Sequence, residues 1–130
     1  MSAFVDTNVL IRHLTGDPPD QAARATRLLA QADQLLLPEL ILAETVDVLK
    51  SFYELPRARV AELVRAIVAF PGIGVADEPL LLRALEVYEV HRLDVADAYL
   101  IAQAEASGVN AVVSFDKRIE RVPTVWRIEP

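Results

Sequence analysis

An aspartate interrupts the apolar start of the chain in the stretch FVDTNVL, where only Thr7 and Asn8 separate Asp6 from the next apolar residues. One explanation is purely structural, because Asp, Thr and Asn favour helix N-caps and a strand ending at Val5 can turn into a helix here. The other is chemical, since a carboxylate at a strand end can bind a metal ion. The remaining acids in the chain decide between the two.

A second carboxylate repeats this arrangement: Asp116 follows the strand-like run AVVSF, residues 111–115. Two more fall on apolar helix faces. Glu44 shares a face with four residues of the predicted helix 39–52: Ile41, Thr45, Val48 and Phe52. Asp97 shares a face of the helix 94–107 with Leu93, Leu100, Ile101 and Ala104. Acids on apolar stripes are uncommon, because burying an unpaired charge costs several kcal/mol.

Each acid also has a simpler explanation. Glu44 can sit at the stripe edge, paired with an arginine. Asp97 can lie in the first turn of its helix, where the helix dipole stabilises a negative charge, with Asp94 as the better N-cap candidate. Asp116 can cap the turn DKRIE. Four acids in separate segments that point to one location favour a shared site instead. Close like charges need a cation, and an all-oxygen site prefers Mg²⁺ or Mn²⁺.

The elements that position these acids alternate between short apolar strands and amphipathic helices. The predicted strands are residues 3–5, 34–38, 73–76, 111–115 and the run TVWRI near the C-terminus. The predicted helices are residues 10–14, 20–32, 39–52, 57–70, 79–91 and 94–107. This alternation predicts an α/β fold with three layers, in which helices cover both faces of a central, mostly parallel sheet. Ligands bind beyond the carboxyl ends of such strands, where Asp6 and Asp116 are expected to meet.

Length and composition set the broad class. A chain of 130 residues predicts one domain over 1–130, and a hydrophobic fraction of 53% predicts a compact core. Without cysteine there is no disulfide or thiolate metal site, which fits a reducing cytoplasm. No signal peptide is expected, since Asp6 and Arg12 break the N-terminal apolar run. No membrane span is expected either, since the longest uncharged apolar stretch, residues 66–76, contains Pro71 and two glycines and is too short to cross a bilayer. The formal net charge of −6 does not by itself indicate nucleic-acid binding, although a bound cation reverses the field within one cleft.

Other chemistries have little support. His13 and His91 are the only histidines, no serine has a G-x-S-x-G setting, and four glycines form no phosphate loop. The basic group Lys117, Arg118 and Arg121 follows Asp116; it is either a solvated face or a holder of phosphate backbone.

These segments resemble the PIN-domain ribonucleases, most closely the VapC-type toxins of bacterial toxin–antitoxin pairs. The resemblance rests on FVDTNVLI, ELILAETVDVL, RLDVADAYLIAQA and AVVSFDKRI, and it runs over nearly the whole chain. It implies that Asp6 and Asp97 bind Mg²⁺ and that Glu44 and Asp116 are the third and fourth catalytic acids. It implies that Asn8 and Ser114 orient them, and it leaves Asp94 outside the site. It further implies a homodimer and a small cognate antitoxin that blocks the cleft.

The expected activity is therefore a Mg²⁺-dependent endoribonuclease that uses water and leaves 5′-phosphate and 3′-hydroxyl ends. A metal held by carboxylates activates water, whereas attack by the RNA 2′-hydroxyl typically relies on paired groups such as histidines. Two alternatives stay open at this point. One is a receiver-like phosphoacceptor signalling domain, and the other is a catalytically inactive PIN-fold partner in a DNA-bound complex.

Overall fold

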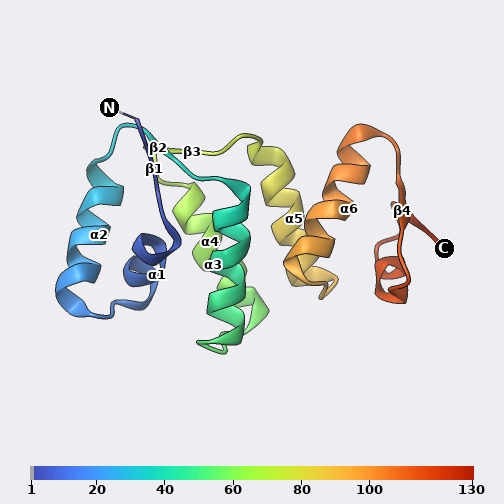
Figure 1. Cartoon of the computed structure of the whole chain (residues 1–130), viewed down its shortest axis with the longest axis horizontal. Helices are drawn as coiled ribbons and strands as arrows, with labels where there is room; N and C mark the ends of the chain where they lie inside the picture. Colours follow the sequence, from blue (N-terminus) through green and yellow to red (C-terminus); the bar gives the residue numbers. More distant parts are fainter. Residues whose placement is uncertain (1) are drawn as a thin grey trace. The chain divides into compact units, whose positions relative to one another are not determined.

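The structure, a computed structural model, describes residues 2–130 (Figure 1). The chain divides into two compact units, residues 2–76 and residues 77–130, called here the first and the second unit. The first unit contains β1 (Ala3–Phe4), α1 (Thr7–Thr15), α2 (Pro19–Gln31), β2 (Leu35–Leu36), α3 (Glu39–Ser51), α4 (Arg57–Val68) and β3 (Ile73–Gly74). The second contains α5 (Glu78–Val90), α6 (Val95–Ser107), β4 (Ala111–Val113), the 3-10 helix η1 (Lys117–Arg121) and β5 (Trp126–Ile128).

The first unit is built on a parallel sheet in the order β1-β2-β3. Phe4 pairs with Leu36, and Leu36 pairs with Gly74. Two helices connect each strand to the next, as parallel pairing requires, since a tight turn cannot bring the chain back to the same end of the sheet. Its largest fully buried side chains come from the helices: Leu10, Leu29, Leu42, Leu49 and Ile67. The strands all point the same way, so the carboxyl end of β1 leads into Asp6 and that of β2 leads into α3.

The second unit pairs two helices with a two-stranded sheet. α5 and α6 pack together, and Ala84 of α5 and Ala102 of α6 form a buried cluster with Leu80, against which Tyr99 packs. β4 and β5 are parallel, with Val113 opposite Ile128. The chain passes from β4 to β5 through η1, so Asp116 lies in the connection that leaves the carboxyl end of β4.

Local signals in the sequence explain where several helices begin and end. Asp6 and Asp77 are N-caps whose side chains accept backbone N–H groups at the starts of α1 and α5. Gly16 ends α1 with a φ of 73°, a left-handed conformation that glycine adopts without strain, and its N–H donates to Arg12 O at 2.9 Å.

The predicted α/β class with parallel strands is confirmed, and the structure contains each predicted element. The strands are shorter than predicted and pair in two sheets, β1-β2-β3 and β4-β5. The first helix begins at Thr7 rather than Leu10 because Asp6 caps it. Single-domain organisation over residues 1–130 stays a prediction. Among residues 2–130, every helix is too short or too polar to span a bilayer.

The predicted buried face of α3 is wrong. Its buried residues are Leu42, Thr45, Val46 and Leu49, whereas Phe52 is 77% exposed. The segment ELILAETVDVLKS is apolar over most of its circumference, so helical periodicity is compatible with more than one stripe. Glu44 is therefore exposed rather than set in the buried stripe.

An ion pair joins the two helices of the second unit. Arg83 of α5 donates from Nε to Glu105 Oε1 at 2.8 Å and from Nη2 to Oε2 at 2.9 Å, and Thr124 also donates to Glu105. The hydrogen bond from Arg83 is the main cause that lowers the pKa of Glu105 from its ordinary value of 4.5. The ionised form is thus favoured by folding, and this stabilisation is present above pH 4.5 and lost as pH falls through the folded-state pKa.

We expect Glu105→Gln to lower the free energy of unfolding at neutral pH by about 1 kcal/mol. The difference from wild type should narrow below pH 4.5, where the glutamate of the unfolded chain is protonated. Urea denaturation at the two pH values measures both effects. Glu86→Gln is the matched control, because Glu86 pairs with the same arginine but is more exposed. If Glu105→Gln destabilises the protein equally at both pH values, the stabilisation does not come from the ionised form of Glu105.

Candidate active site

Asp6 lies just beyond β1 and caps α1. Its Oδ1 accepts the N–H of Thr7 at 2.9 Å, and the side chain is exposed. Within residues 2–130 its second oxygen, Oδ2, has no hydrogen-bond partner, so capping leaves half of the carboxylate available. Thr7 is 6% exposed, and its Oγ1 likewise has no partner among the described residues. The capping explanation is therefore correct, and it does not use up the carboxylate.

Glu44 lies on the exposed side of α3 in the same unit. Its neighbour Thr45 is buried, and Thr45 Oγ1 donates back to Ile41 O at 2.8 Å, one turn earlier in the helix. No ion pair involves Glu44 within the described chain, so the predicted alternative of an arginine partner has no support there.

Asp97 lies half-buried in the first turn of α6, which begins after the N-cap Asp94. The pKa of Asp97 is raised above its ordinary value of 3.8, mainly because burial removes water from the carboxylate. The negative charges of Asp116 and Asp94 raise it further, while Arg118 lowers it. Three carboxylates of the second unit therefore lie within electrostatic range of one another.

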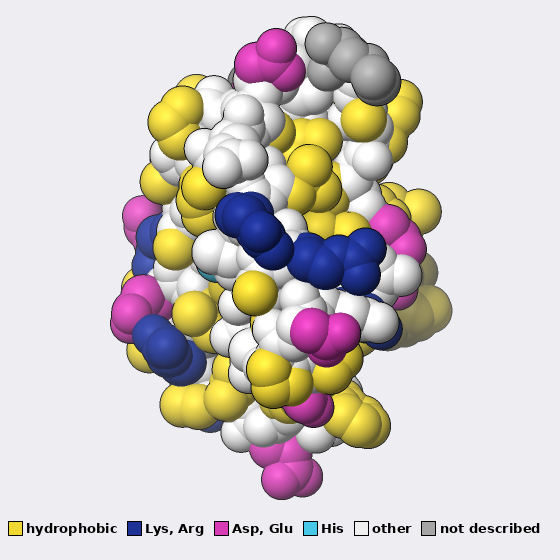
Figure 2. Space-filling model, turned by 90° about the vertical axis from the view of Figure 1, so that its left-hand side faces the viewer, with side chains coloured by type: hydrophobic (Ala, Val, Ile, Leu, Met, Phe, Trp, Pro, Cys, Tyr) yellow, Lys and Arg dark blue, Asp and Glu magenta, His cyan; other side chains and the backbone are white. Residues whose placement is uncertain are grey.

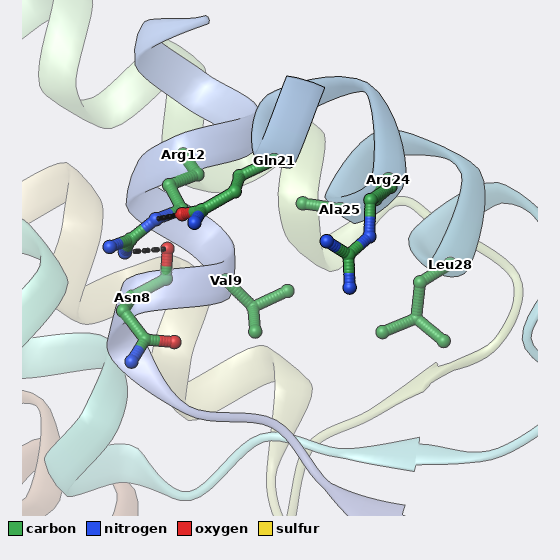
Figure 3. Close-up of a pocket in the computed structure, with 7 residues that line it drawn as sticks. All are labelled: Asn8, Val9, Arg12, Gln21, Arg24, Ala25 and Leu28. Atoms are coloured by element: carbon green, nitrogen blue, oxygen red, sulfur yellow. Dashed lines mark hydrogen bonds between the residues drawn. The ribbon is translucent and has the colours of Figure 1, made fainter. Parts of the chain in front are cut away.

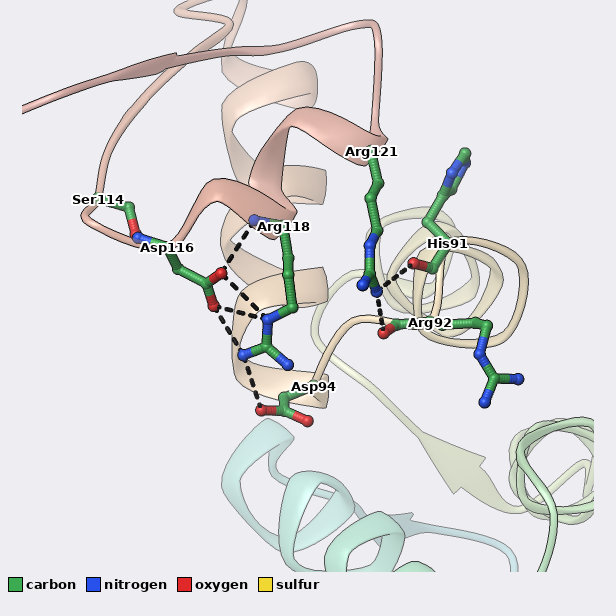
Figure 4. A network of polar contacts seen from close by, with 7 residues as sticks. All are labelled: His91, Arg92, Asp94, Ser114, Asp116, Arg118 and Arg121. Atoms are coloured by element: carbon green, nitrogen blue, oxygen red, sulfur yellow. Dashed lines mark hydrogen bonds and ion pairs between the residues drawn. The ribbon is translucent and has the colours of Figure 1, made fainter.

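Asp116 has a cation of its own (Figure 4). Arg118 donates from Nε to both carboxylate oxygens at 3.0 Å and from Nη2 to Oδ2 at 2.7 Å, and its backbone N–H donates to Oδ1 at 2.9 Å. These hydrogen bonds lower the pKa of Asp116 to about 2. The same Nη2 lies 3.8 Å from Asp94 Oδ2. Arg118 thus pairs with Asp116 and lies near Asp94, whereas Asp97 has no ion pair with any residue of 2–130.

Further contacts fix the connection that carries Asp116. Ser114 Oγ accepts the N–H of Asp116 at 2.9 Å, and its role in orienting the acids stays a prediction. The carbonyl of Ser114 accepts from Arg127 Nη1 at 2.8 Å. Arg121 of η1 donates to Arg92 O at 3.0 Å and to His91 O at 3.4 Å, which ties η1 to the turn that precedes α6. The segments bearing Asp97 and Asp116 are thereby held near each other.

Arg118, Arg121 and Arg127 were not predicted as organisers of the acids. Arg118 and Arg121 were predicted as a solvated face or a phosphate holder, whereas the structure pairs Arg118 with Asp116 and Arg121 with backbone carbonyls. Arg127 has no sequence signal at all, since its contact with Ser114 depends on the pairing of β4 with β5.

Residues 3–125 match the PIN domain family. The chain belongs to the PIN domain family. The match spans segments of both units and contains Asp6, Glu44, Asp97 and Asp116, which confirms the predicted family. No curated protein matches the chain. PIN domains are typically nucleases and generally use divalent metal ions, so membership supports a hydrolase that acts on nucleic acid.

The donor set of this PIN domain fits a hard divalent cation. Its candidate ligands are carboxylate oxygens, and burial, together with Asp116 and Asp94, raises the pKa of Asp97 and so disfavours its ionised form. Among residues 2–130, no three or more His, Asp or Glu side chains form a group that could hold a metal ion. The structure brings Asp94, Asp97 and Asp116 into electrostatic range in the second unit, and Asp6 and Glu44 belong to the first.

Asp97→Asn should stabilise the protein in metal-free buffer at neutral pH. Because the folded-state pKa is raised, the contribution of Asp97 to stability is most favourable below pH 3.8 and is lost as pH rises through the folded-state pKa. The dipole of α6 stabilises the negative charge of Asp97, but burial and two neighbouring carboxylates together destabilise it. We expect a rise in Tm of about 2 °C at neutral pH and convergence with wild type in acid.

Thermal unfolding followed by circular dichroism in the presence of chelator measures the difference in Tm between Asp97→Asn and wild type. Asp47→Asn, on an exposed position of α3, is the control for loss of one negative charge. A lower Tm for Asp97→Asn than for wild type at neutral pH would show that the carboxylate stabilises the fold and is not a strained ligand.

Proposed function

We propose that this PIN domain is a Mg²⁺-dependent endoribonuclease and the toxin of a type II toxin–antitoxin system. The supporting observation is a half-buried carboxylate, Asp97, whose pKa is raised by its surroundings, in a chain that matches the PIN domain over residues 3–125. Asp6 and Asp97 bind the metal in this proposal, and Glu44 and Asp116 complete the catalytic acids. Mn²⁺ is a plausible substitute, because it shares the preference for oxygen ligands.

A divalent ion bound by these acids would supply an activated water and neutralise charge on the phosphate. The protein's part is to hold Asp6 and Asp116 after strands and Glu44 and Asp97 on helices, where a phosphodiester can approach. Asp116 is suited to stay ionised, since Arg118 keeps its pKa near 2. Asp6 offers the oxygen that does not cap α1.

The histidines give no support to the 2′-hydroxyl route. His13 Nδ1 lies 2.7 Å from Thr26 Oγ1, and the ring packs edge-on against Phe70 with centroids 5.5 Å apart. Burial lowers the pKa of His13, which disfavours a protonated general acid. His91 is the C-cap of α5 in the other unit. Hydrolysis by water, with 5′-phosphate and 3′-hydroxyl products, therefore suits these residues better.

The biological setting is proposed from the family resemblance alone. A small antitoxin protein would bind the domain and block RNA access, the toxin would act as a homodimer, and both would reside in the cytoplasm. The PIN domain match favours this account over a receiver-like phosphoacceptor module. The remaining alternative is a catalytically inactive PIN-fold partner in a DNA-bound complex, and the next experiment distinguishes it from a nuclease.

Asp6→Asn and Asp97→Asn should each reduce cleavage of RNA about 100-fold or more, since each removes a proposed metal ligand. Wild type with Mg²⁺ should give 5′-phosphate and 3′-hydroxyl ends, and chelator should abolish cleavage. RNA-end sequencing and ligation assays on purified protein identify the ends. Asp47→Asn is the control and should cleave at the wild-type rate.

If wild type produces cyclic-phosphate ends and Asp6→Asn abolishes this cleavage, the water mechanism is wrong but the proposed metal site stands. Wild-type protein that cleaves no RNA with Mg²⁺ or Mn²⁺ would point instead to the inactive binding partner.

Arg118 should lower the affinity of the proposed site for a divalent ion, because it pairs with the catalytic acid Asp116. Because its guanidinium occupies both oxygens of that carboxylate, Arg118→Gln should raise the affinity for Mn²⁺ about 2- to 5-fold, as expected for loss of one exposed competing ion pair. Electron paramagnetic resonance of free Mn²⁺ measures the affinity without RNA. Lys117→Gln removes a neighbouring positive charge that makes no contact with Asp116 among residues 2–130. If both variants gain the same affinity for Mn²⁺, the effect comes from net charge and not from the ion pair between Arg118 and Asp116.

A further inference from the structure

A pocket of about 470 Å³ lies between α1 and α2 in the first unit (Figure 3). α1 contributes Asn8, Val9 and Arg12, and α2 contributes Gln21, Arg24, Ala25 and Leu28. No residue of this lining is acidic, although the whole chain carries a formal net charge of −6. The pocket is thus a locally positive, donor-rich surface on an acidic protein. In Figure 2, Lys and Arg side chains lie side by side across the middle of the face that contains α2.

The two arginines of the pocket differ in how they are held. Arg12 donates from Nε to Gln21 Oε1 and from Nη1 to Asn8 O at 3.2 Å, so its orientation is fixed by both helices. Arg24 is exposed and has no hydrogen bond or ion pair with any residue of the described chain. Asp20 precedes it by one helical turn, but no ion pair forms between them. The guanidinium of Arg24 extends from α2 into the pocket (Figure 3).

This combination fits an anion with several acceptor oxygens. Guanidinium groups bind phosphate through paired hydrogen bonds, and the carboxamides of Asn8 and Gln21 are further donors in the same lining. Val9 and Leu28 add apolar surface that can contact a sugar or base. A phosphodiester strand presents both kinds of surface in succession.

The pocket also lies near the proposed catalytic Asp6 along α1, although Asp6 does not line it. Asn8 lies two residues after Asp6, and Arg12 lies six residues after it, about 9 Å along α1 at the usual helical rise. A strand whose scissile phosphate is at Asp6 therefore passes this pocket with a neighbouring phosphate. This proximity favours RNA over an acidic peptide of a protein partner, for which no such relation to Asp6 is needed.

We infer that the pocket between α1 and α2 binds a backbone phosphate of the RNA substrate next to the scissile one, with Arg24 as the phosphate ligand and Arg12 as its fixed neighbour. The identity of the strand as substrate RNA rests on the proposed function. The pocket's affinity for a phosphodiester backbone does not depend on cleavage, so the two are tested separately.

The experiment is binding of a short fluorescein-labelled oligoribonucleotide of mixed sequence to metal-free protein in chelator, followed by fluorescence anisotropy over a series of salt concentrations. Arg24→Gln should weaken binding about 5-fold at low salt and reduce the salt slope by about 0.7, the contribution of one single-strand phosphate. Arg27→Gln is the matched control, because Arg27 is also exposed on α2 but lies outside the pocket. It should leave the slope at the wild-type value.

Equal effects of Arg24→Gln and Arg27→Gln, or no binding by wild type, would overturn the inference. So would an Arg24→Gln variant that binds RNA normally and loses binding of polyglutamate, which would assign the pocket to an acidic protein partner. If the slope falls only in Arg24→Gln but no RNA is cleaved with Mg²⁺, the phosphate site stands and the proposed nuclease function fails. If RNA is cleaved while the two variants bind alike, only this inference fails.

Discussion

Two neighbouring carboxylates of the second unit experience opposite electrostatic environments, and the candidate site depends on this difference. Arg118 compensates Asp116 and lowers its pKa to about 2, whereas burial together with Asp116 and Asp94 raises the pKa of Asp97. One acid thus has its cation and the other lacks one. Burial and the neighbouring negative charges both disfavour the ionised form of Asp97, and a bound divalent ion would offset both effects. The proposed metal site follows from this imbalance.

Secondary structure places these acids by ordinary capping chemistry. Asp6 caps α1 and Asp116 caps η1 by accepting backbone N–H groups, whereas Asp94 precedes α6 without a side-chain cap hydrogen bond. A carboxylate has two oxygens with several lone pairs, so one that accepts a backbone N–H retains capacity for a metal or a donor group. Structural and catalytic roles of the same aspartate are therefore compatible, and Arg121 and Arg127 hold the loops between these caps in position.

Much of this arrangement is predictable from sequence. Residue types and periods predict the α/β class, the order of the elements and the positions of Asp6 and Asp116 after strands, because strand and cap preferences act over a few residues. The buried face of α3 is not predictable in the same way, since ELILAETVDVLKS offers apolar residues on several sides and packing partners choose among them. The bidentate contact of Arg118 with Asp116 depends on the 3-10 geometry of η1, which local preference does not specify. Likewise Arg12 and Arg24 come together only because α1 packs against α2.

The central proposal is that Asp6 and Asp97 bind a divalent ion, and paramagnetic relaxation by Mn²⁺ tests it most directly. Substoichiometric Mn²⁺ broadens the amide resonances of residues near the bound ion in a ¹⁵N-labelled protein, independently of any RNA. The account predicts simultaneous broadening around Asp6 and Thr7 of the first unit and around Asp97 and Asp116 of the second, reversed by chelator and absent in Asp97→Asn. Broadening confined to one unit, or unchanged in Asp97→Asn, would contradict it.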